Sequence, residues 1–320
     1  MGSGSDFFVG LDLGGSFLKY ALGRRDGKLL KKGKMPSKAD KSQDDIFNVI
    51  FSAISEMQEE AEKLSGTVVG IGLGSPGAIH FKECRLIGST PNLPEWTNAP
   101  IRERIEGETE LPIWADNDAN IMAFGESRVG AAKGAQDVLC ATLGTGIGGG
   151  IIINGSVYRG AYYAGAEIGH MMIVHDGIPC NCGGRGCFEK YASAPAMMRR
   201  FRDHLKAANK DVIESDSTVD LFRAAQENSP EAIETIKETV GYLGTGFSGL
   251  INIFNPEVLV LGGGVAEAGD EFIAQIEADI RERAMEPATR HLKVVRATLG
   301  NDAGVYGAIT LAAEMYDLQK

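Results

Sequence analysis

Four short runs of mostly apolar, often β-branched residues each end in a cluster of glycines. They occupy residues 7–15, 68–77, 138–150 and 258–264. An apolar run of about four to eight residues that stops at turn-forming residues is typical of a buried strand. Because each run ends so abruptly, we expect each strand to enter a tight turn.

Between these runs, apolar residues recur at the spacing of a helix. Apolar residues recur three and four positions apart at 44–64, 100–106, 194–207, 218–228, 230–254 and 269–285. This spacing puts apolar side chains on one face of a helix. Strands that alternate with helices predict an α/β fold. The first and third glycine turns lie roughly 130 residues apart, about one domain length, which favours two related halves.

Composition narrows the class of protein. The 320 residues are 43% hydrophobic and 23% charged, as expected of a folded chain of about two domains. The formal net charge of −11 opposes binding to nucleic acid or to an anionic membrane surface. We see neither an apolar run near the roughly 18 residues that span a bilayer nor a charged-then-apolar leader. We therefore expect a cytoplasmic protein that binds small molecules.

The first glycine turn, Asp12-Leu-Gly-Gly-Ser-Phe-Leu-Lys19, combines groups that suit phosphate. Gly14 and Gly15 let backbone N–H groups approach phosphate oxygens, and Ser16 can donate a hydrogen bond. Asp12 could hold magnesium through water, and Lys19 adds an ammonium group. The spacing is neither that of a P-loop nor that of the Gly-x-Gly-x-x-Gly dinucleotide fingerprint. We interpret the turn as a phosphate-binding hairpin.

Two later glycine turns are candidates for nucleotide contacts. The turn at 144–150 has glycines at the dinucleotide spacing, but an isoleucine run typical of a strand follows it where that fold requires a helix. A β-hairpin that touches phosphate through Thr145 and Gly146 fits better. Gly263 and Gly264 precede a predicted helix, and their missing side chains leave room for a purine or ribose.

Candidate acid–base groups lie at Trp114-Ala-Asp-Asn-Asp-Ala-Asn120, where a predicted strand runs into a helix that begins near Ala119. Asp118 could accept a proton from an alcohol while Asn117 holds a neighbouring hydroxyl. The alternative is that Asp116 or Asp118 only caps the helix, because Asp is frequent at such positions.

Three of the five cysteines fall within eight positions, at Cys180, Cys182 and Cys187, and the first lies ten residues after His170. One imidazole and three thiolates complete the tetrahedral shell of a structural zinc, which leaves no open site for catalysis. The alternatives are unligated thiols or a disulfide, which a cytoplasmic protein disfavours.

Polar side chains flank this cysteine cluster. His170 could place one ring nitrogen on the metal and the other on a substrate hydroxyl. Glu167 precedes it by three residues, and Glu189 follows the last cysteine. Carboxylates, an amide and an imidazole, with no serine or thiol nucleophile beside them, suit a neutral polyhydroxylated ligand.

Together these motifs resemble the ROK family of sugar kinases and repressors, over about residues 7–315. The shared motifs are Asp12-Leu-Gly-Gly-Ser, Asn117-Asp-Ala-Asn120, Leu143-Gly-Thr-Gly-Ile-Gly-Gly-Gly150, Glu167-Ile-Gly-His170 and Cys-x-Cys-Gly-x-x-Gly-Cys-x-Glu. Ser16 stands where the family usually has threonine, which keeps the hydroxyl. The resemblance implies an actin-like ATPase fold with two α/β domains around a cleft. The small domain would be 1–122, closed by a helix at 303–320, and the large domain 123–302 would carry the zinc.

The resemblance also implies roles for individual residues. Asp118 would be the catalytic base. The zinc ligands would be His170, Cys180, Cys182 and Cys187. The sugar ligands would be Gly77, Asn92, Asn117, Asp118, Glu167, His170 and Glu189. The contacts to ATP and magnesium would be Asp12, Gly14, Gly15, Ser16, Lys19, Thr145, Gly146, Gly263 and Gly264.

Within the family the chain most resembles the glucokinases, through 91–96, 116–120 and 165–170. This implies transfer of the γ-phosphate of ATP to the 6-hydroxyl of glucose, with Mg²⁺, a structural Zn²⁺ and a homodimer. Kinases for N-acetylmannosamine, N-acetylglucosamine, fructose or allose share most of the pocket, so another hexose is the alternative. The family's repressors carry a DNA-binding segment before the first strand, where about six residues stand here. A repressor is therefore less favoured. Asp118 and the two phosphate turns argue against a non-catalytic sugar-binding regulator, and a hydrolase of the same fold is a further alternative.

Overall fold

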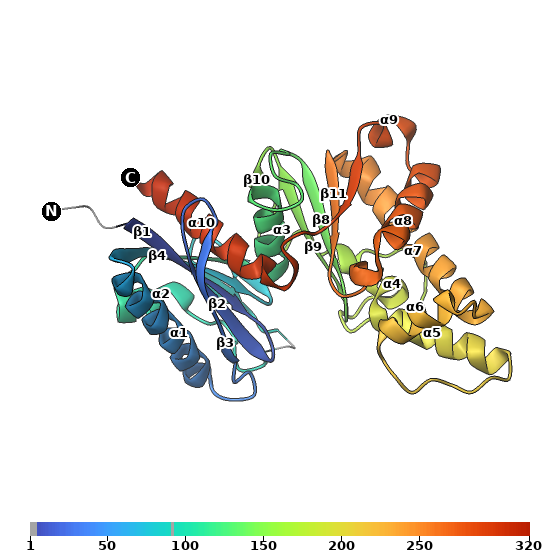
Figure 1. Ribbon diagram of the computed structural model, residues 1–320, viewed down its shortest axis with the longest axis horizontal. Helices are drawn as coiled ribbons and strands as arrows, with labels where there is room; N and C mark the ends of the chain where they lie inside the picture. The colour runs from blue at the N-terminus through green and yellow to red at the C-terminus, as the bar shows by residue number, and fades with distance from the viewer. Residues whose placement is uncertain (1–4, 91–92) are drawn as a thin grey trace. The chain divides into compact units, whose positions relative to one another are not determined.

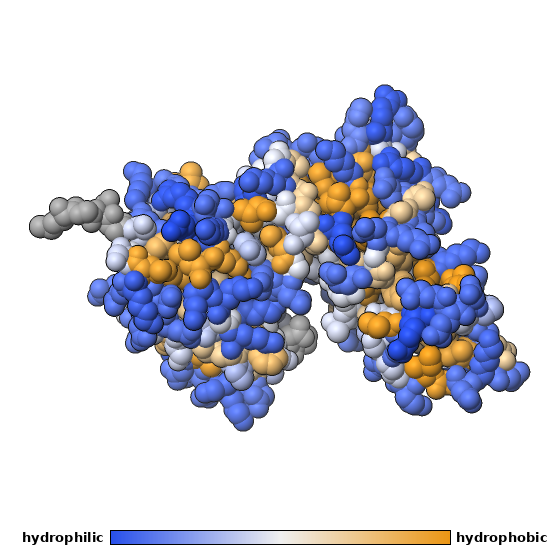
Figure 2. All heavy atoms as spheres, viewed as in Figure 1, coloured by the Kyte–Doolittle hydropathy of each residue, from blue (hydrophilic) through white to orange (hydrophobic). Residues whose placement is uncertain are grey.

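The computed structural model describes residues 5–90 and 93–320. The chain forms two compact units. Unit 1 comprises Met1–Gly134, Gly150–Ala166 and Thr298–Lys320, and unit 2 comprises Ala135–Gly149 and Glu167–Ala297. Figure 2 shows hydrophilic side chains over most of the visible surface, with hydrophobic residues exposed between them in several places. Among the described residues, none of the helices combines the length and the apolar character needed to cross a membrane.

Unit 1 is built on a five-stranded sheet in the order β3-β2-β1-β4-β7. Its strands are β1 (Ser5–Leu13), β2 (Phe17–Gly23), β3 (Leu29–Pro36), β4 (Gly66–Ser75) and β7 (Ile113–Asn117). The first three pair antiparallel, whereas β1, β4 and β7 run parallel. Parallel strands end at the same edge of a sheet, and the register accordingly places Asp12 beside Gly74 and Gly74 beside Asp116. Ser75 lies beside Asn117.

Helices cover both faces of this sheet (Figure 1). They are α1 (Gln43–Lys63), α2 (Ile101–Thr109), α3 (Asp118–Arg128) and α10 (Ala303–Gln319), and a short hairpin of β5 (Ala78–His80) and β6 (Arg85–Ile87) adds to the unit. Apolar residues of α1 and of β1 form one buried core, which includes Val9, Leu11 and Phe47. On the other face, α10 lies so close to the sheet that a side chain at Gly10 or Gly72 would collide with carbonyl oxygens of the helix. Glycine at both positions permits this close packing.

Unit 2 contains most of a second sheet, in the order β10-β9-β8-β11-β12. Its strands are β8 (Val138–Leu143), β9 (Ile147–Ile153), β10 (Ser156–Val157), β11 (Val258–Gly262) and β12 (Lys293–Arg296). The division between the units falls within β9, at Gly149 and Gly150. β8, β11 and β12 run parallel, and Gly262 lies beside Thr142 in the register.

The helices of unit 2 follow the apolar periodicity of the sequence. They are α4 (Glu189–Ala192), α5 (Ala194–Ala207), α6 (Thr218–Gln226), α7 (Pro230–Phe254), α8 (Asp270–Arg283) and α9 (Glu286–Thr289), with short 3₁₀ turns at Ile168–His170, Ala266–Ala268 and, in unit 1, Gly300–Asp302. The longest, α7, begins where the Ser229 side chain accepts from the Ala232 N–H, and ends at Asn255 in a left-handed conformation. The structure thus confirms the α/β fold, the four glycine-terminated strands and the six predicted helices.

Candidate functional site

The end of β7 and the start of α3 position Asn117 and Asp118. The Asn117 Oδ1 accepts from the backbone N–H groups of Ala119 at 3.0 Å and Asn120 at 3.2 Å, which makes Asn117 the N-cap. The N-cap is thus Asn117, and not Asp116 or Asp118 as the alternative interpretation had it. Asp118 is half-buried in the first turn, and its Oδ1 lies 2.8 Å from the Ala119 nitrogen. A helix N-terminus favours an ionised carboxylate, which a general base requires.

The sugar-ligand candidates of unit 1 meet at this point. The Asn117 Nδ2 donates to the carbonyl oxygen of Gly77 at 3.1 Å, so two segments far apart in the sequence are held together. Gly77 has φ +92°, a conformation that L side chains rarely adopt. Asn92 lies outside the described residues.

The predicted phosphate hairpin forms the turn between β1 and β2. The Gly14 N–H donates to the Phe17 carbonyl oxygen at 2.9 Å, and Gly15 and Ser16 are exposed. Asp12 Oδ2 lies 3.6 Å from the Lys19 Nζ, which also donates to the Asn301 carbonyl oxygen. Burial raises the pKa of the Asp12 carboxyl, and the Lys19 ammonium opposes that shift. The hairpin therefore combines the paired Asp12 carboxylate and Lys19 ammonium group with an exposed turn at Gly15 and Ser16.

The two nucleotide-contact candidates of unit 2 lie at the ends of neighbouring strands. The turn with Thr145 and Gly146 follows β8, and the turn with Gly263 and Gly264 follows β11. The Val265 N–H donates to the Leu143 carbonyl oxygen at 3.0 Å, which ties the second turn to the end of β8. A side chain at Gly146 would lie 2.8 Å from the Glu189 Oε2. The backbone at Gly146 therefore faces Glu189, which is one of the predicted sugar ligands.

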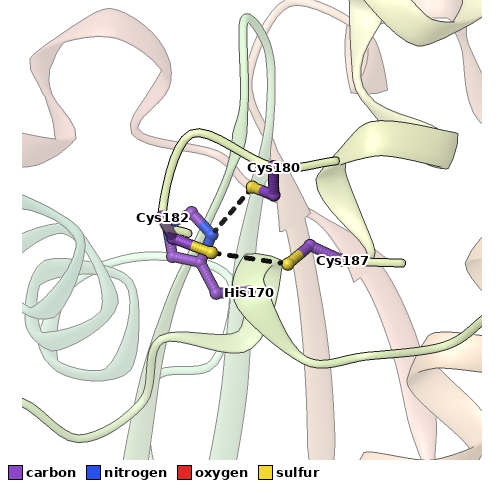
Figure 3. A group of neighbouring side chains, drawn as sticks. All are labelled: His170, Cys180, Cys182 and Cys187. Atoms are coloured by element: carbon purple, nitrogen blue, oxygen red, sulfur yellow. Dashed lines mark hydrogen bonds between the residues drawn. The ribbon is translucent and has the colours of Figure 1, made fainter. Parts of the chain in front are cut away.

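The four predicted zinc ligands converge (Figure 3). One ligand atom from each of His170, Cys180, Cys182 and Cys187 lies within 4.8 Å of all the others. The His170 Nδ1 is 3.7 Å from the Cys180 Sγ, and the Cys182 and Cys187 sulfurs are 3.5 Å apart. A tetrahedron with zinc–sulfur bonds of about 2.3 Å has edges of about 3.8 Å, so the set could hold zinc. All five cysteines are free thiols in this structure.

Local backbone geometry produces this convergence. Gly183 and Gly186 adopt positive φ values, and the Cys180 N–H donates to the Gly184 carbonyl oxygen at 2.9 Å. A backbone hydrogen bond from Gly184 lowers the pKa of the Cys182 thiol, whereas burial raises that of Cys187 to about 12. Metal binding would have to displace that proton, because zinc binds the thiolate.

Glu189 and His170 lie together beside the cysteine cluster. The Glu189 Oε1 is 4.0 Å from the His170 Nδ1 and accepts from the Cys180 thiol at 3.4 Å. Glu167 is exposed and directly precedes the 3₁₀ turn that ends at His170. Each unit thus gathers its own share of the predicted site residues.

Sequence reasoning missed the arginines that hold α4, the helix that begins with Glu189. The Arg199 Nη2 donates to the Lys190 carbonyl oxygen at 2.7 Å, and Arg200 donates to the Tyr191 carbonyl oxygen. The Tyr191 hydroxyl in turn accepts from the Ile178 N–H at 2.8 Å, in the zinc loop. Adjacent arginines on an amphipathic helix were the only sequence signal, and they do not identify their partners.

Comparisons with known proteins identify the family of this chain. The model of the ROK family matches residues 8–315. A glucokinase of Halalkalibacterium halodurans is 35% identical over 309 residues, which cover 94% of this chain and 93% of that protein. A ROK family glucokinase of Streptomyces griseus, crystallised with glucose and AMPPNP, is 31% identical with a TM-score of 0.79, covering 96% of this chain and 99% of that one. A xylose repressor of Caldicellulosiruptor bescii is 30% identical, covering 95% of this chain and 77% of that protein. The structural match confirms the actin-like ATPase fold.

Proposed function

The chain belongs to the ROK family, and on that basis we propose that it is an ATP-dependent hexose kinase that phosphorylates the 6-hydroxyl of glucose. The observation that carries the proposal is the half-buried Asp118 carboxylate at the N-terminus of α3, next to an asparagine fixed as the helix cap. The full-length similarity to proteins named glucokinase supports glucose as the substrate.

Asp118 would act as the general base. It would accept the proton of the 6-hydroxyl while that oxygen bonds to the γ-phosphorus and the bond from the γ-phosphorus to the β–γ bridging oxygen breaks, releasing ADP. Phosphoryl transfer needs little covalent help from a protein, so positioning and electrostatics would supply most of the rate. The sugar ligands would be Gly77, Asn92, Asn117, Glu167, His170 and Glu189.

The phosphate-binding groups would be those of the glycine turns, which are Gly14, Gly15, Ser16, Thr145, Gly146, Gly263 and Gly264. Asp12 would hold Mg²⁺ through water, and the cation would neutralise charge on the phosphates. A zinc held by His170 and the three cysteines would be structural, since all four coordination positions are filled by protein.

Two alternatives follow from the comparisons. Another hexose, such as N-acetylmannosamine, N-acetylglucosamine, fructose or allose, could be the substrate, because ROK proteins with different sugars share the fold. A sugar-binding regulator without turnover is the second, because a xylose repressor matches over 95% of this chain. We further propose a cytoplasmic homodimer, as the resemblance implies.

The proposal is tested by coupled ADP release with ATP and magnesium over a panel of glucose, N-acetylglucosamine, N-acetylmannosamine, fructose, mannose and allose. We expect turnover on glucose and a loss of roughly 10²–10⁴-fold in kcat for Asp118→Ala. Glucose affinity, measured by calorimetry, should change little. Asp270→Ala is the matched control, because Asp270 is also the first residue of a helix, α8. Near-normal turnover by Asp118→Ala would exclude this residue as the base.

A further inference from the structure

A buried ion pair lies directly beside the proposed catalytic segment. Asp116, the residue before Asn117, has a side chain only 3% exposed, and its Oδ2 accepts from the Arg159 Nε at 2.6 Å. Arg159 lies in the part of unit 1 that follows β10, 43 residues further along the chain. A buried charge pair persists only where hydrogen bonds satisfy both partners, so the surroundings of each group are informative.

The second oxygen of Asp116 holds the start of α3. The Asp116 Oδ1 accepts from the Asn117 N–H at 2.8 Å and from the Asn120 Nδ2 at 3.1 Å. These two donors flank Asp118 in the sequence. The carboxylate therefore holds the backbone just before the proposed base and a side chain two residues after it, while its other oxygen faces the guanidinium.

Arg159 is itself held from several directions. Its guanidinium carbon lies 3.7 Å from the centroid of the Phe81 ring, and its Nη1 donates to the Val157 carbonyl oxygen at 3.3 Å. The Arg159 carbonyl oxygen accepts from the Gly165 N–H at 3.0 Å. A planar guanidinium can stack on a ring and pair with a carboxylate at the same time, which a lysine ammonium cannot.

We propose that Arg159 is a positioning residue, which fixes Asn117 and Asp118 by holding the carboxylate of Asp116. The role in turnover rests on the proposed kinase function. Without Arg159, the buried carboxylate would lose its only paired cation among the described residues and would have to turn toward water or take up a proton. Turning away would release the Asn117 and Asn120 groups that Asp116 now binds, and protonation would weaken both hydrogen bonds because the acceptor would lose its charge. Burial already raises the pKa of Asp116, and the Arg159 charge opposes this shift.

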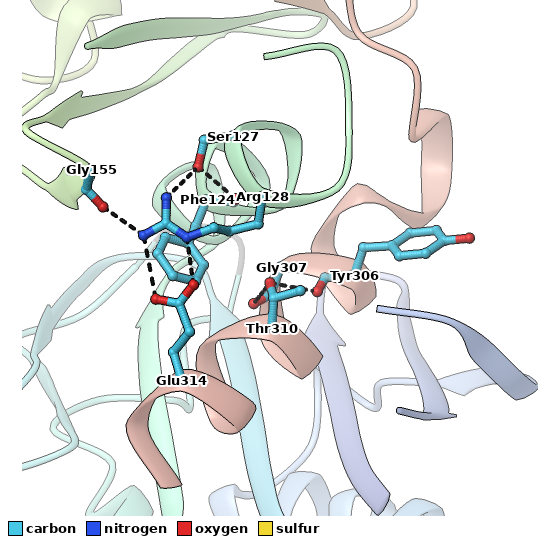
Figure 4. A network of polar contacts seen from close by, with 8 residues as sticks. All are labelled: Phe124, Ser127, Arg128, Gly155, Tyr306, Gly307, Thr310 and Glu314. Carbon is cyan, nitrogen blue, oxygen red and sulfur yellow. Dashed lines mark hydrogen bonds and ion pairs between the residues drawn. The ribbon is translucent and has the colours of Figure 1, made fainter. Parts of the chain in front are cut away.

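Arg128 offers a matched control within unit 1. Its Nε donates to the Glu314 carboxylate at 2.5 Å, its Nη2 donates to the Gly155 carbonyl oxygen, and its guanidinium lies 4.4 Å from the Phe124 ring centroid (Figure 4). The chemistry matches that of Arg159, but Arg128 is the last residue of α3 and Asp118 is the first. The Glu314 side chain is 46% exposed whereas that of Asp116 is 3% exposed, so Arg128→Gln should cost less stability than Arg159→Gln. Arg128→Gln therefore controls for the loss of an arginine ion pair in unit 1 that does not involve the start of α3.

The experiment compares Arg159→Gln, Arg159→Lys and Arg128→Gln in the full chain, by hydrogen–deuterium exchange, thermal unfolding and kinetics. We expect Arg159→Gln to speed exchange at the Ala119 and Asn120 amides, and to lower kcat roughly 10- to 100-fold with KM changed less than about threefold. Arg159→Lys keeps the positive charge, and it replaces Arg159→Gln as the test if the Gln variant does not fold. It should show the same changes at smaller size. Arg128→Gln should lower only the Tm.

A further variant tests whether the effect passes through Asp118. In an Asp118→Ala background, Arg159→Gln should lower turnover less than it does in the wild type, because the part of its effect that acts through Asp118 is already lost. An additive loss there, normal exchange at both amides, or equal effects of Arg128→Gln would overturn the proposal. If the wild type turns over no sugar, the kinase function fails, whereas the exchange rates still decide whether Arg159 holds this segment.

Discussion

The side-chain amide of Asn117 donates to the backbone carbonyl oxygen of Gly77 at 3.1 Å. The same amide group caps α3 through its oxygen, so one side chain joins the turn after β4 to the helix that carries Asp118. A displacement of either segment should therefore be felt by the other.

Gly77→Ala tests this link. Gly77 has φ +92°, and an added Cβ would lie 2.8 Å from the Leu86 Cδ1. We expect a loss of about 1–2 kcal/mol in the free energy of unfolding from the left-handed backbone, a further loss from the clash, and weaker sugar binding. Gly88→Ala is the control, because Gly88 has φ +74° but open space around it. Urea unfolding and calorimetry should show equal effects of both variants if only backbone strain matters.

Cys182→Ser tests the metal site. We expect the wild type to contain one zinc per chain by elemental analysis, and the variant to lose it, because a serine hydroxyl is a poor substitute for a thiolate ligand. Sugar affinity should fall as His170 becomes mobile. Cys84→Ala removes a buried thiol outside the cluster, whose pKa burial raises to about 12, and should keep its zinc. A wild-type protein that contains no zinc and still binds sugar with normal affinity would contradict the proposed zinc site.

Glu126→Gln tests a fully buried carboxylate at the end of α3. Glu126 accepts from the backbone N–H groups of Ala131 at 2.7 Å and Leu299 at 2.9 Å, and so joins two distant segments of unit 1. An amide has only one acceptor oxygen, so one buried N–H would lose its partner. We expect a loss of about 1–3 kcal/mol in the free energy of unfolding. Glu59→Gln, on the exposed face of α1, should be neutral; equal stability of both variants would contradict the role of Glu126.

Acid stability should depend on Glu231 at the start of α7. A hydrogen bond from Lys210 lowers the pKa of its carboxyl from 4.5 to about 2. A lowered pKa in the folded state stabilises above pH 4.5, and this contribution disappears as the pH falls toward 2. Lys210→Gln should therefore flatten the decline of the Tm between these pH values. Lys237→Gln, which removes another exposed lysine of unit 2, should leave the wild-type slope; an unchanged slope in Lys210→Gln would reject the assignment.

Local patterns in the sequence were sufficient to predict the helices, the strands and the cluster of one histidine and three cysteines. Apolar periodicity and glycine clusters report directly on strands and helices, and ligand type with close spacing identifies the metal cluster. Boundaries were less accurate. Helix α2 continues past Gly107 to Thr109, because the chain does not leave helical geometry until Glu110 adopts a left-handed conformation.

Side-chain partners distant in sequence could not be predicted. Nothing near Asp116 in the sequence indicates Arg159, because their pairing depends on where the segment after β10 lies. Which of Asp116, Asn117 and Asp118 caps the helix could not be predicted either, since both Asp and Asn suit that position. Only the strand register and the rotamers decide which oxygen faces the free N–H groups.

The close packing of α10 on Gly10 and Gly72 has a consequence for biosynthesis. The ribosome makes residues 303–319 after the whole of unit 2, so the part of the first sheet around Gly10 and Gly72 stays uncovered while unit 2 is already complete. Domains usually fold in the order of their synthesis, N-terminal first. Here the N-terminal strands must wait for the last helix, and the central unit can reach its native state before the unit that begins the chain.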